Sequence, residues 1–134
     1  MTDAEILTLV DRLERCLFAP SEFHHKDHLT VAVAYLYAAG FDSASFDTAM
    51  DKLRATLARF ISYHGARGYN ETLTRFWLLQ VEKRIDRKLC LQESVKRVTA
   101  ELSRKEMIYE FYSREKLNSP EAKQGWVEPD LKIW

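Results

Sequence analysis

Apolar residues recur every three or four positions along most of the chain, which is the spacing of amphipathic helices. This pattern predicts five main helices, over residues 2–18, 27–39, a stretch of 41–63 that begins near Ser43 or Ser45, 70–88 and 91–104. Thr2 and Glu5 fit a capping box at the start of the first helix. Gly40 suits the left-handed position that ends the second, and Asn70 is a good N-cap for the fourth.

The helix over residues 27–39 is apolar on nearly all sides, as is typical of a helix that its neighbours bury. We expect it at the centre of an irregular all-α bundle that forms one domain over residues 1–134. Ser119 and Pro120 predict one short C-terminal helix, because proline is favoured at the first helical position. The tail over residues 109–134 is too apolar for a loose end and is expected to pack back over the bundle.

Composition supports a folded helical protein and excludes other classes. Apolar residues make up 46% of the chain and charged residues 30%, which excludes a disordered protein. The 4 glycines and 3 prolines are too few for the many turns of an all-β fold. The 20 basic residues balance the 20 acidic ones, so the net charge does not favour nucleic acid. Residues 83–105 are locally basic, and we interpret them as a solvated helical face rather than an RNA-binding surface.

The sequence predicts a cytoplasmic protein with no membrane partner. Acidic residues interrupt the first helix where a signal peptide would be apolar, and the longest apolar run, residues 31–39, is too short to span a bilayer. Cys16 and Cys90 have no neighbouring cysteine, so we expect reduced thiols. The high aromatic content, at 12%, is compatible with a homodimer.

Three of the four histidines lie within five residues, at the start of the second helix. His25 and His28 are three positions apart and His24 and His28 four apart, so either pair can share one helical face. Two imidazoles on one turn suit iron, zinc, copper or nickel. The alternative is that His24 and His25 are solvated and that His28 is a structural histidine.

A metal centre also needs a third ligand. Glu71 begins the fourth helix and His64 ends the third. If the second and fourth helices are neighbours, Glu71 can complete a set of two histidines and one carboxylate with an open coordination position. The alternative role for Glu71 is an acid that interacts favourably with the helix dipole.

Two blocks of the sequence carry a family resemblance. Residues 23–29 fit the pattern aromatic-x-His-x-x-His-Leu, and residues 68–77 fit Gly-Tyr-His-Glu-Thr-x-Thr-x-Phe-Trp except at Asn70. On these blocks the chain resembles an uncharacterised family of small bacterial all-α proteins. The resemblance favours His25 and His28 over His24. Because asparagine replaces the second block's histidine, the chain uses His25, His28 and Glu71, recruits His64, or has lost the metal.

Further residues are candidates for a substrate pocket near this centre: Tyr35, Tyr69, Asn70, Thr74 and Arg75. The phenol of Tyr35 lies two turns after His28 on about the same helical face. Arg75 can pair with Glu71 or hold an anionic ligand. For the aromatic residues the alternative is core packing, and for Arg75 it is a surface ion pair.

The first functional hypothesis is therefore a small metal-dependent enzyme of hydrolase or oxygenase type that acts on a small molecule. His25 and His28 would bind the metal, and Glu71 would be a ligand or the general base. The alternative is a non-enzymatic helical module that binds a small ligand or dimerises without metal. The sequence does not decide whether the protein is an enzyme.

Overall fold

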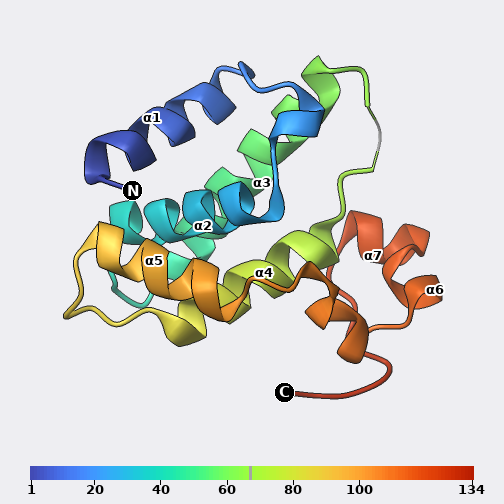
Figure 1. The fold of residues 1–134 in the computed structure, drawn as a ribbon. Coiled ribbons are helices and arrows are strands. Elements are labelled where there is room, and N and C mark those ends of the chain that lie inside the picture. The colour runs from blue at the N-terminus through green and yellow to red at the C-terminus, as the bar shows by residue number, and fades with distance from the viewer. Residues whose placement is uncertain (67) are drawn as a thin grey trace.

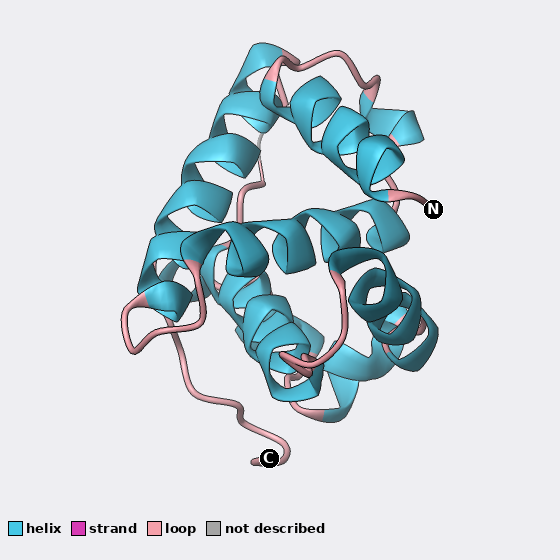
Figure 2. Ribbon diagram, turned by 90° about the vertical axis from the view of Figure 1, so that its left-hand side faces the viewer, coloured by secondary structure: helices cyan, strands magenta, loops and turns pink. Residues whose placement is uncertain are grey.

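The computed structural model describes residues 1–66 and 68–134, and its regular structure is entirely helical (Figures 1 and 2). Five long helices carry the fold: α1 (Asp3–Glu14), α2 (His25–Ala39), α3 (Ser45–Tyr63), α4 (Glu71–Arg84) and α5 (Leu91–Glu101). Shorter helical turns are η1 (Pro20–Glu22), η2 (Lys105–Glu110), α6 (Arg114–Leu117) and α7 (Pro120–Gln124). The predicted all-α bundle with five main helices is confirmed.

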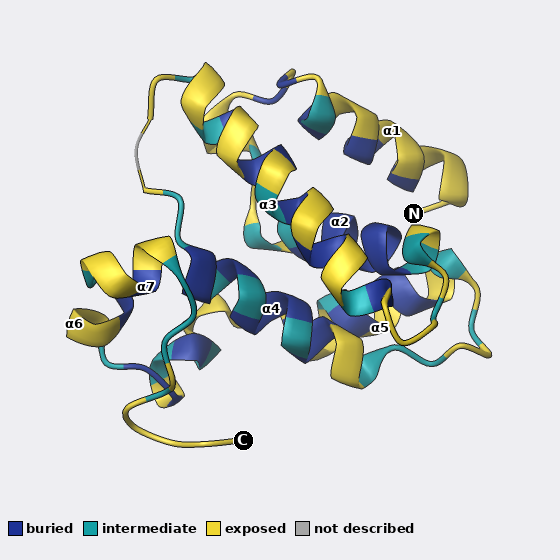
Figure 3. Cartoon of the chain, turned by 180° about the vertical axis from the view of Figure 1, so that it is seen from behind, coloured by how far each residue is buried: buried dark blue, intermediate teal, exposed yellow. Residues whose placement is uncertain are grey.

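Helix α2 is the centre of the bundle, as its sequence predicts. It packs against α1, α3, α4 and α5 (Figure 1), and every residue from Leu29 to Leu36 is buried. Figure 3 shows how the other long helices turn a dark buried face inward and a yellow exposed face outward. In the described part of the chain, no helix combines the length and apolarity that crossing a bilayer requires.

Local capping signals set several helix ends where the sequence places them. The amide of Thr2 donates to Glu5 Oε1 at 2.9 Å, and the amide of Glu5 donates to Thr2 Oγ1 at 3.2 Å, so the capping box is complete. Gly40 ends α2 at φ 94°, in the left-handed region. Ser119 caps α7, with Pro120 at its first position.

Three helices end earlier than the apolar pattern predicts. Helix α1 stops at Glu14, because Cys16 adopts a left-handed φ of 59°. Helix α4 stops at Arg84, and Asp86 then accepts a hydrogen bond from the Lys88 amide in a local turn. Helix α5 stops at Glu101, so the residues that follow form the separate turns η2 and α6. The segment over residues 64–68 contains two glycines and is predicted from the sequence to be a loop; Arg67 within it lies outside the described residues.

The C-terminal tail lies against α4. The Trp134 ring is 5.4 Å from that of Phe76 on α4, and α7 contacts the same helix. Two hydrogen bonds tie the tail to the segment after η2. The Tyr112 hydroxyl donates to the Val127 carbonyl at 2.6 Å, and the Leu131 amide donates to the Phe111 carbonyl at 2.9 Å. The tail therefore supports the η2–α6 segment from outside.

Candidate functional site

Two of the three histidines in the 24–28 cluster, His25 and His28, line one pocket, which we call the His25 pocket. It has a volume of about 470 Å³ and lies between the start of α2, the first half of α4 and the η2–α6 segment. Its lining residues are His25, His28, Leu73, Trp77, Lys105, Glu106, Ile108, Tyr109 and Arg114. Residues from four elements, separated by up to 89 positions, thus form one concave surface.

His25 is held by two contacts. Its Nε2 lies 2.8 Å from the carbonyl oxygen of Leu102, and its ring meets Trp77 edge-on at 4.5 Å between centroids. Because a carbonyl only accepts, Nε2 carries the proton in this hydrogen bond, and Nδ1 of the neutral ring is left as an acceptor. Leu102 is the C-cap of α5, so His25 satisfies a carbonyl at the end of that helix.

Both histidines of the pocket are uncharged near neutral pH. Burial, together with a smaller effect of the nearby His25, lowers the pKa of His28 to about 4. Burial also lowers the pKa of His25, against the opposing effect of its hydrogen bond to Leu102. His28 Nε2 is enclosed and has no hydrogen-bond partner among the described residues. The imidazoles therefore add polarity to the pocket and no positive charge.

Helix α4 presents two different faces, and this separates the predicted ligands. Leu73 and Trp77 are four residues apart and line the pocket, so their face is turned toward the histidines. Glu71 is two residues before Leu73, which places it about 160° away around the helix axis. Helices α2 and α4 are neighbours, as the predicted site requires, but the rotation of α4 about its axis turns the Glu71 carboxylate away from the imidazoles.

The Glu71 carboxylate is instead part of a partly buried ion pair with Arg54 of α3. Arg54 donates to it through Nε at 2.9 and 3.1 Å and through Nη2 at 2.7 Å, and the Tyr69 hydroxyl donates to it at 2.6 Å. Burial raises the pKa of Glu71, but the hydrogen bonds from Arg54 and Tyr69 outweigh it, so the net pKa is lowered. Burial and Glu71 together raise the pKa of Tyr69. The Arg54–Glu71 ion pair, supported by the neutral Tyr69 phenol, joins α3 to α4.

Asn70 and Thr74 also act at the start of α4 and do not line the His25 pocket. Asn70 Oδ1 accepts from the Leu73 amide at 2.9 Å, which confirms the predicted N-cap. Its Nδ2 donates to the Leu117 carbonyl of α6 at 2.7 Å. The Thr74 hydroxyl donates to the Asn70 carbonyl at 2.9 Å. Asn70, which replaces the histidine of the family's second block, is thus a structural cap.

The remaining candidates lie at other interfaces. The Tyr35 hydroxyl donates to Glu14 at 2.7 Å and pairs with Thr56 at 2.9 Å, because it lies about 10 Å further along α2 than His28. The guanidinium carbon of Arg75 lies 5.1 Å from the Phe46 ring centroid. His64 ends α3, packs edge-on against Phe60 at 4.8 Å, and does not line the pocket.

The predicted metal-ligand set is therefore not assembled. Within residues 1–66 and 68–134, no three histidine, cysteine, aspartate or glutamate side chains lie close enough together to hold a metal ion. His25 and His28 do meet, but neither Glu71 nor His64 joins them. Glu71 is bound by Arg54 and Tyr69 and is not placed to act on a molecule in the pocket.

Sequence reasoning missed the residues that form the opposite wall, namely Lys105, Tyr109 and Arg114. The sequence pattern assigns Lys105 to a solvated basic face and Tyr109 and Arg114 to the C-terminal tail, whereas η2 begins at Lys105 and α6 begins at Arg114. Arg114, the first residue of α6, lies over the Tyr109 ring of η2, with the guanidinium carbon 4.1 Å from the centroid. Basic residues at 104, 105 and 114 that flank aromatic residues at 109, 111 and 112 were the available signal.

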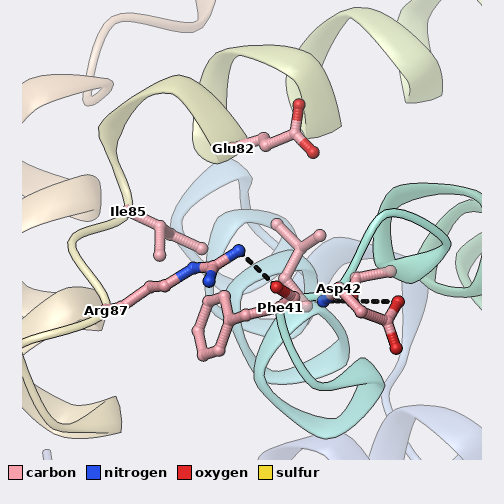
Figure 4. A pocket seen from close by; sticks show the side chains of 7 residues that line it. Phe41, Asp42, Glu82, Ile85 and Arg87 are labelled. Atoms are coloured by element: carbon pink, nitrogen blue, oxygen red, sulfur yellow. Dashed lines mark hydrogen bonds between the residues drawn. The ribbon is translucent and has the colours of Figure 1, made fainter.

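A second hollow, of about 250 Å³, lies where the α2–α3 turn meets the end of α4. Figure 4 shows Arg87 reaching across it to donate to the carbonyl of Phe41, with Glu82 on the opposite side. The guanidinium carbon is 5.3 Å from the Phe41 ring centroid. Because the chain's own arginine covers this ring, the hollow offers less apolar surface to a ligand than the His25 pocket does.

Comparison with known proteins adds no relative. The chain matches no protein-family model, no curated protein and no solved structure.

Proposed function

We propose that this chain binds a small planar aromatic molecule in the His25 pocket. The observation that carries the proposal is the composition of the pocket wall. Leu73 and Tyr109 provide partly exposed apolar and aromatic surface beside the buried Trp77 and Ile108, and two uncharged imidazoles provide polar atoms. Small-molecule sites have this character: they are concave, mostly apolar, and contain a few placed polar groups.

The size of the pocket also supports this proposal. About 470 Å³ lies within the range of roughly 300–1,000 Å³ that is usual for small-molecule sites. Several walls are fixed by contacts within the protein. Trp77 is almost fully buried and packs against Phe76 and His25, so its position does not depend on a ligand. A preformed wall lowers the entropy lost on binding.

The metal-dependent enzyme predicted from the sequence stays a prediction. It needs a third ligand beside His25 and His28, and Glu71 does not supply one because its carboxylate faces Arg54. The binding function needs only groups that already line the pocket.

A titration with 2-naphthol tests the proposal, with ligand-observed NMR as the readout. The Leu73→Trp variant places a larger side chain into the pocket, and Leu79→Trp is the matched control on the same helix, outside the lining. We expect saturable binding to the wild type and to Leu79→Trp, and at least about tenfold weaker binding to Leu73→Trp. No saturable binding, or equal binding to Leu73→Trp, would overturn the proposal.

A further inference from the structure

Two basic side chains stand at the mouth of the His25 pocket. Lys105 begins η2 and Arg114 begins α6, and both are exposed while lining the pocket. Neither forms an ion pair within residues 1–66 and 68–134. Arg104, which lies next to Lys105 in the chain, is by contrast 3.7 Å from Glu110. The two pocket cations are thus available to a ligand.

Arg114 is also oriented by the protein. Its guanidinium carbon lies 4.1 Å from the Tyr109 ring centroid, and Tyr109 itself lines the pocket. This cation–π contact restrains the side chain at the mouth without using its N–H groups in an ion pair. A guanidinium presents paired N–H donors that match the two oxygens of a carboxylate, which makes arginine well suited to bind that group.

The charges that line the pocket favour an anion. Lys105 and Arg114 contribute two positive charges and Glu106 one negative charge, and the imidazoles are neutral. A neutral aromatic ligand would use the apolar wall and leave both cations at the mouth without a partner. A cationic ligand would be repelled by them.

We propose that the ligand of the His25 pocket is an aromatic carboxylate, whose ring packs between Trp77 and Tyr109 and whose carboxylate is bound by Lys105 and Arg114. This inference rests on the proposed function and adds the charge of the ligand to it. The apolar wall at Leu73 and Ile108 distinguishes such a ligand from a free inorganic anion, which would have no use for that surface.

Three ligands of nearly the same shape separate charge from fit: 2-naphthoate, the neutral 2-naphthamide and the cationic 2-naphthamidine. Calorimetric titration should show that naphthoate binds about tenfold more tightly than naphthamide, since two charge-assisted hydrogen bonds are added. Naphthamidine should bind most weakly. Salt near 0.5 M should weaken naphthoate binding and leave naphthamide binding almost unchanged. Equal affinity for naphthoate and naphthamide, or preference for naphthamidine, would overturn the inference.

Variants at the mouth assign the effect to named groups. We expect Lys105→Gln and Arg114→Gln each to weaken naphthoate about three- to tenfold and to leave naphthamide unchanged. Glu106→Gln should tighten naphthoate a few fold, because it removes a like charge. Lys116→Gln makes the same charge change outside the lining and should have little effect. If Arg114→Gln disturbs the fold by losing the contact with Tyr109, Arg114→Lys is the second variant. It keeps the positive charge and should retain part of the affinity for naphthoate.

The outcomes distinguish the two levels of the proposal. If no naphthalene ligand binds, or if Leu73→Trp binds them like the wild type, the proposed function fails. If all three ligands bind the wild type equally and Leu73→Trp excludes them, only the charge inference fails. Displacement of naphthoate by millimolar inorganic phosphate alone would also overturn the inference that the ligand is an aromatic carboxylate, because it would show an anion site that does not need the ring.

Discussion

The side-chain nitrogen of Asn70 donates a 2.7 Å hydrogen bond to the carbonyl oxygen of Leu117, which joins the N-cap of α4 to the last residue of α6. Helix α6 begins with Arg114, a wall residue of the His25 pocket. Because the Oδ1 of Asn70 caps α4 at the same time, one amide fixes two elements of the pocket relative to each other. This dual hydrogen bonding explains why asparagine serves this position.

Replacing Asn70 tests this coupling. Asn70→Ala removes the cap and the bond to Leu117, so we expect a loss of about 2 kcal/mol in the free energy of unfolding, measured by urea denaturation. Asn70→Ser keeps an acceptor for the cap and loses the donor to Leu117, so its loss should be smaller. Asn118→Ala, at an exposed position, is the control. If Asn70→Ala unfolds like the wild type, the amide does not hold these elements.

The Arg54–Glu71 pair should stabilise the fold near neutral pH. Arg54→Met leaves a mostly buried carboxylate without its cation. Because Arg54 is 41% exposed, we expect a loss of about 2 kcal/mol rather than the larger loss of a fully buried pair. The matched control is Arg59→Met, an exposed arginine on the same helix. Equal unfolding midpoints for the two variants would contradict the account.

The Arg54–Glu71 pair also makes the stability of the fold depend on pH in the acidic range. The pKa of Glu71 is lower in the folded state than its ordinary value of 4.5, so the folded protein releases this proton more readily than the unfolded chain. The stabilisation is present above pH 4.5 and is lost as the pH falls through the lower folded pKa. Arg54→Met should therefore lose less stability than the wild type on acidification below pH 4.5, as followed by thermal unfolding.

His28 should affect stability at a higher pH. Its pKa is about 4 in the folded protein, against 6.5 in the unfolded chain, so the unfolded state binds more protons between these values. Stability is then full above pH 6.5 and falls as the pH drops toward 4. His28→Leu should reduce the loss between about pH 7 and pH 5 by at most about 2 kcal/mol. His24→Leu, at the exposed histidine, should behave like the wild type, and an unchanged pH profile in His28→Leu would refute this account.

Thr72 should hold the C-terminal tail on α4. Its hydroxyl donates to the Gly125 carbonyl at 2.7 Å and accepts from the Val127 amide at 3.1 Å, and the residue is fully buried. Thr72→Val keeps the shape and leaves both backbone groups without this partner, which should cost about 1–3 kcal/mol in urea denaturation. Thr72→Ser keeps the hydroxyl and should lose less. Equal losses in the two variants would show that packing, not hydrogen bonding, dominates.

Much of the fold follows from signals within a few residues of each other. The Thr2 capping box, the left-handed Gly40 and the Asn70 cap act locally, so the sequence is sufficient to place them. The site depends on relations that local patterns do not contain. Arg54 is 17 positions from Glu71, and only the register between α3 and α4 brings them together. The pattern also extended α5 beyond Glu101, and this concealed the turn that brings Lys105 to the histidines.

The central claim is that the His25 pocket is the ligand site, and chemical-shift mapping with 2-naphthoate tests it most directly. In an ¹⁵N spectrum, the indole N–H of Trp77 and the amides of His25, Tyr109 and Arg114 should shift with one common saturation curve. The indole of Trp134, which ends the tail and packs against Phe76, should stay in place. Shifts centred on Phe41 and Arg87 instead, or no saturable shift at Trp77, would contradict the account.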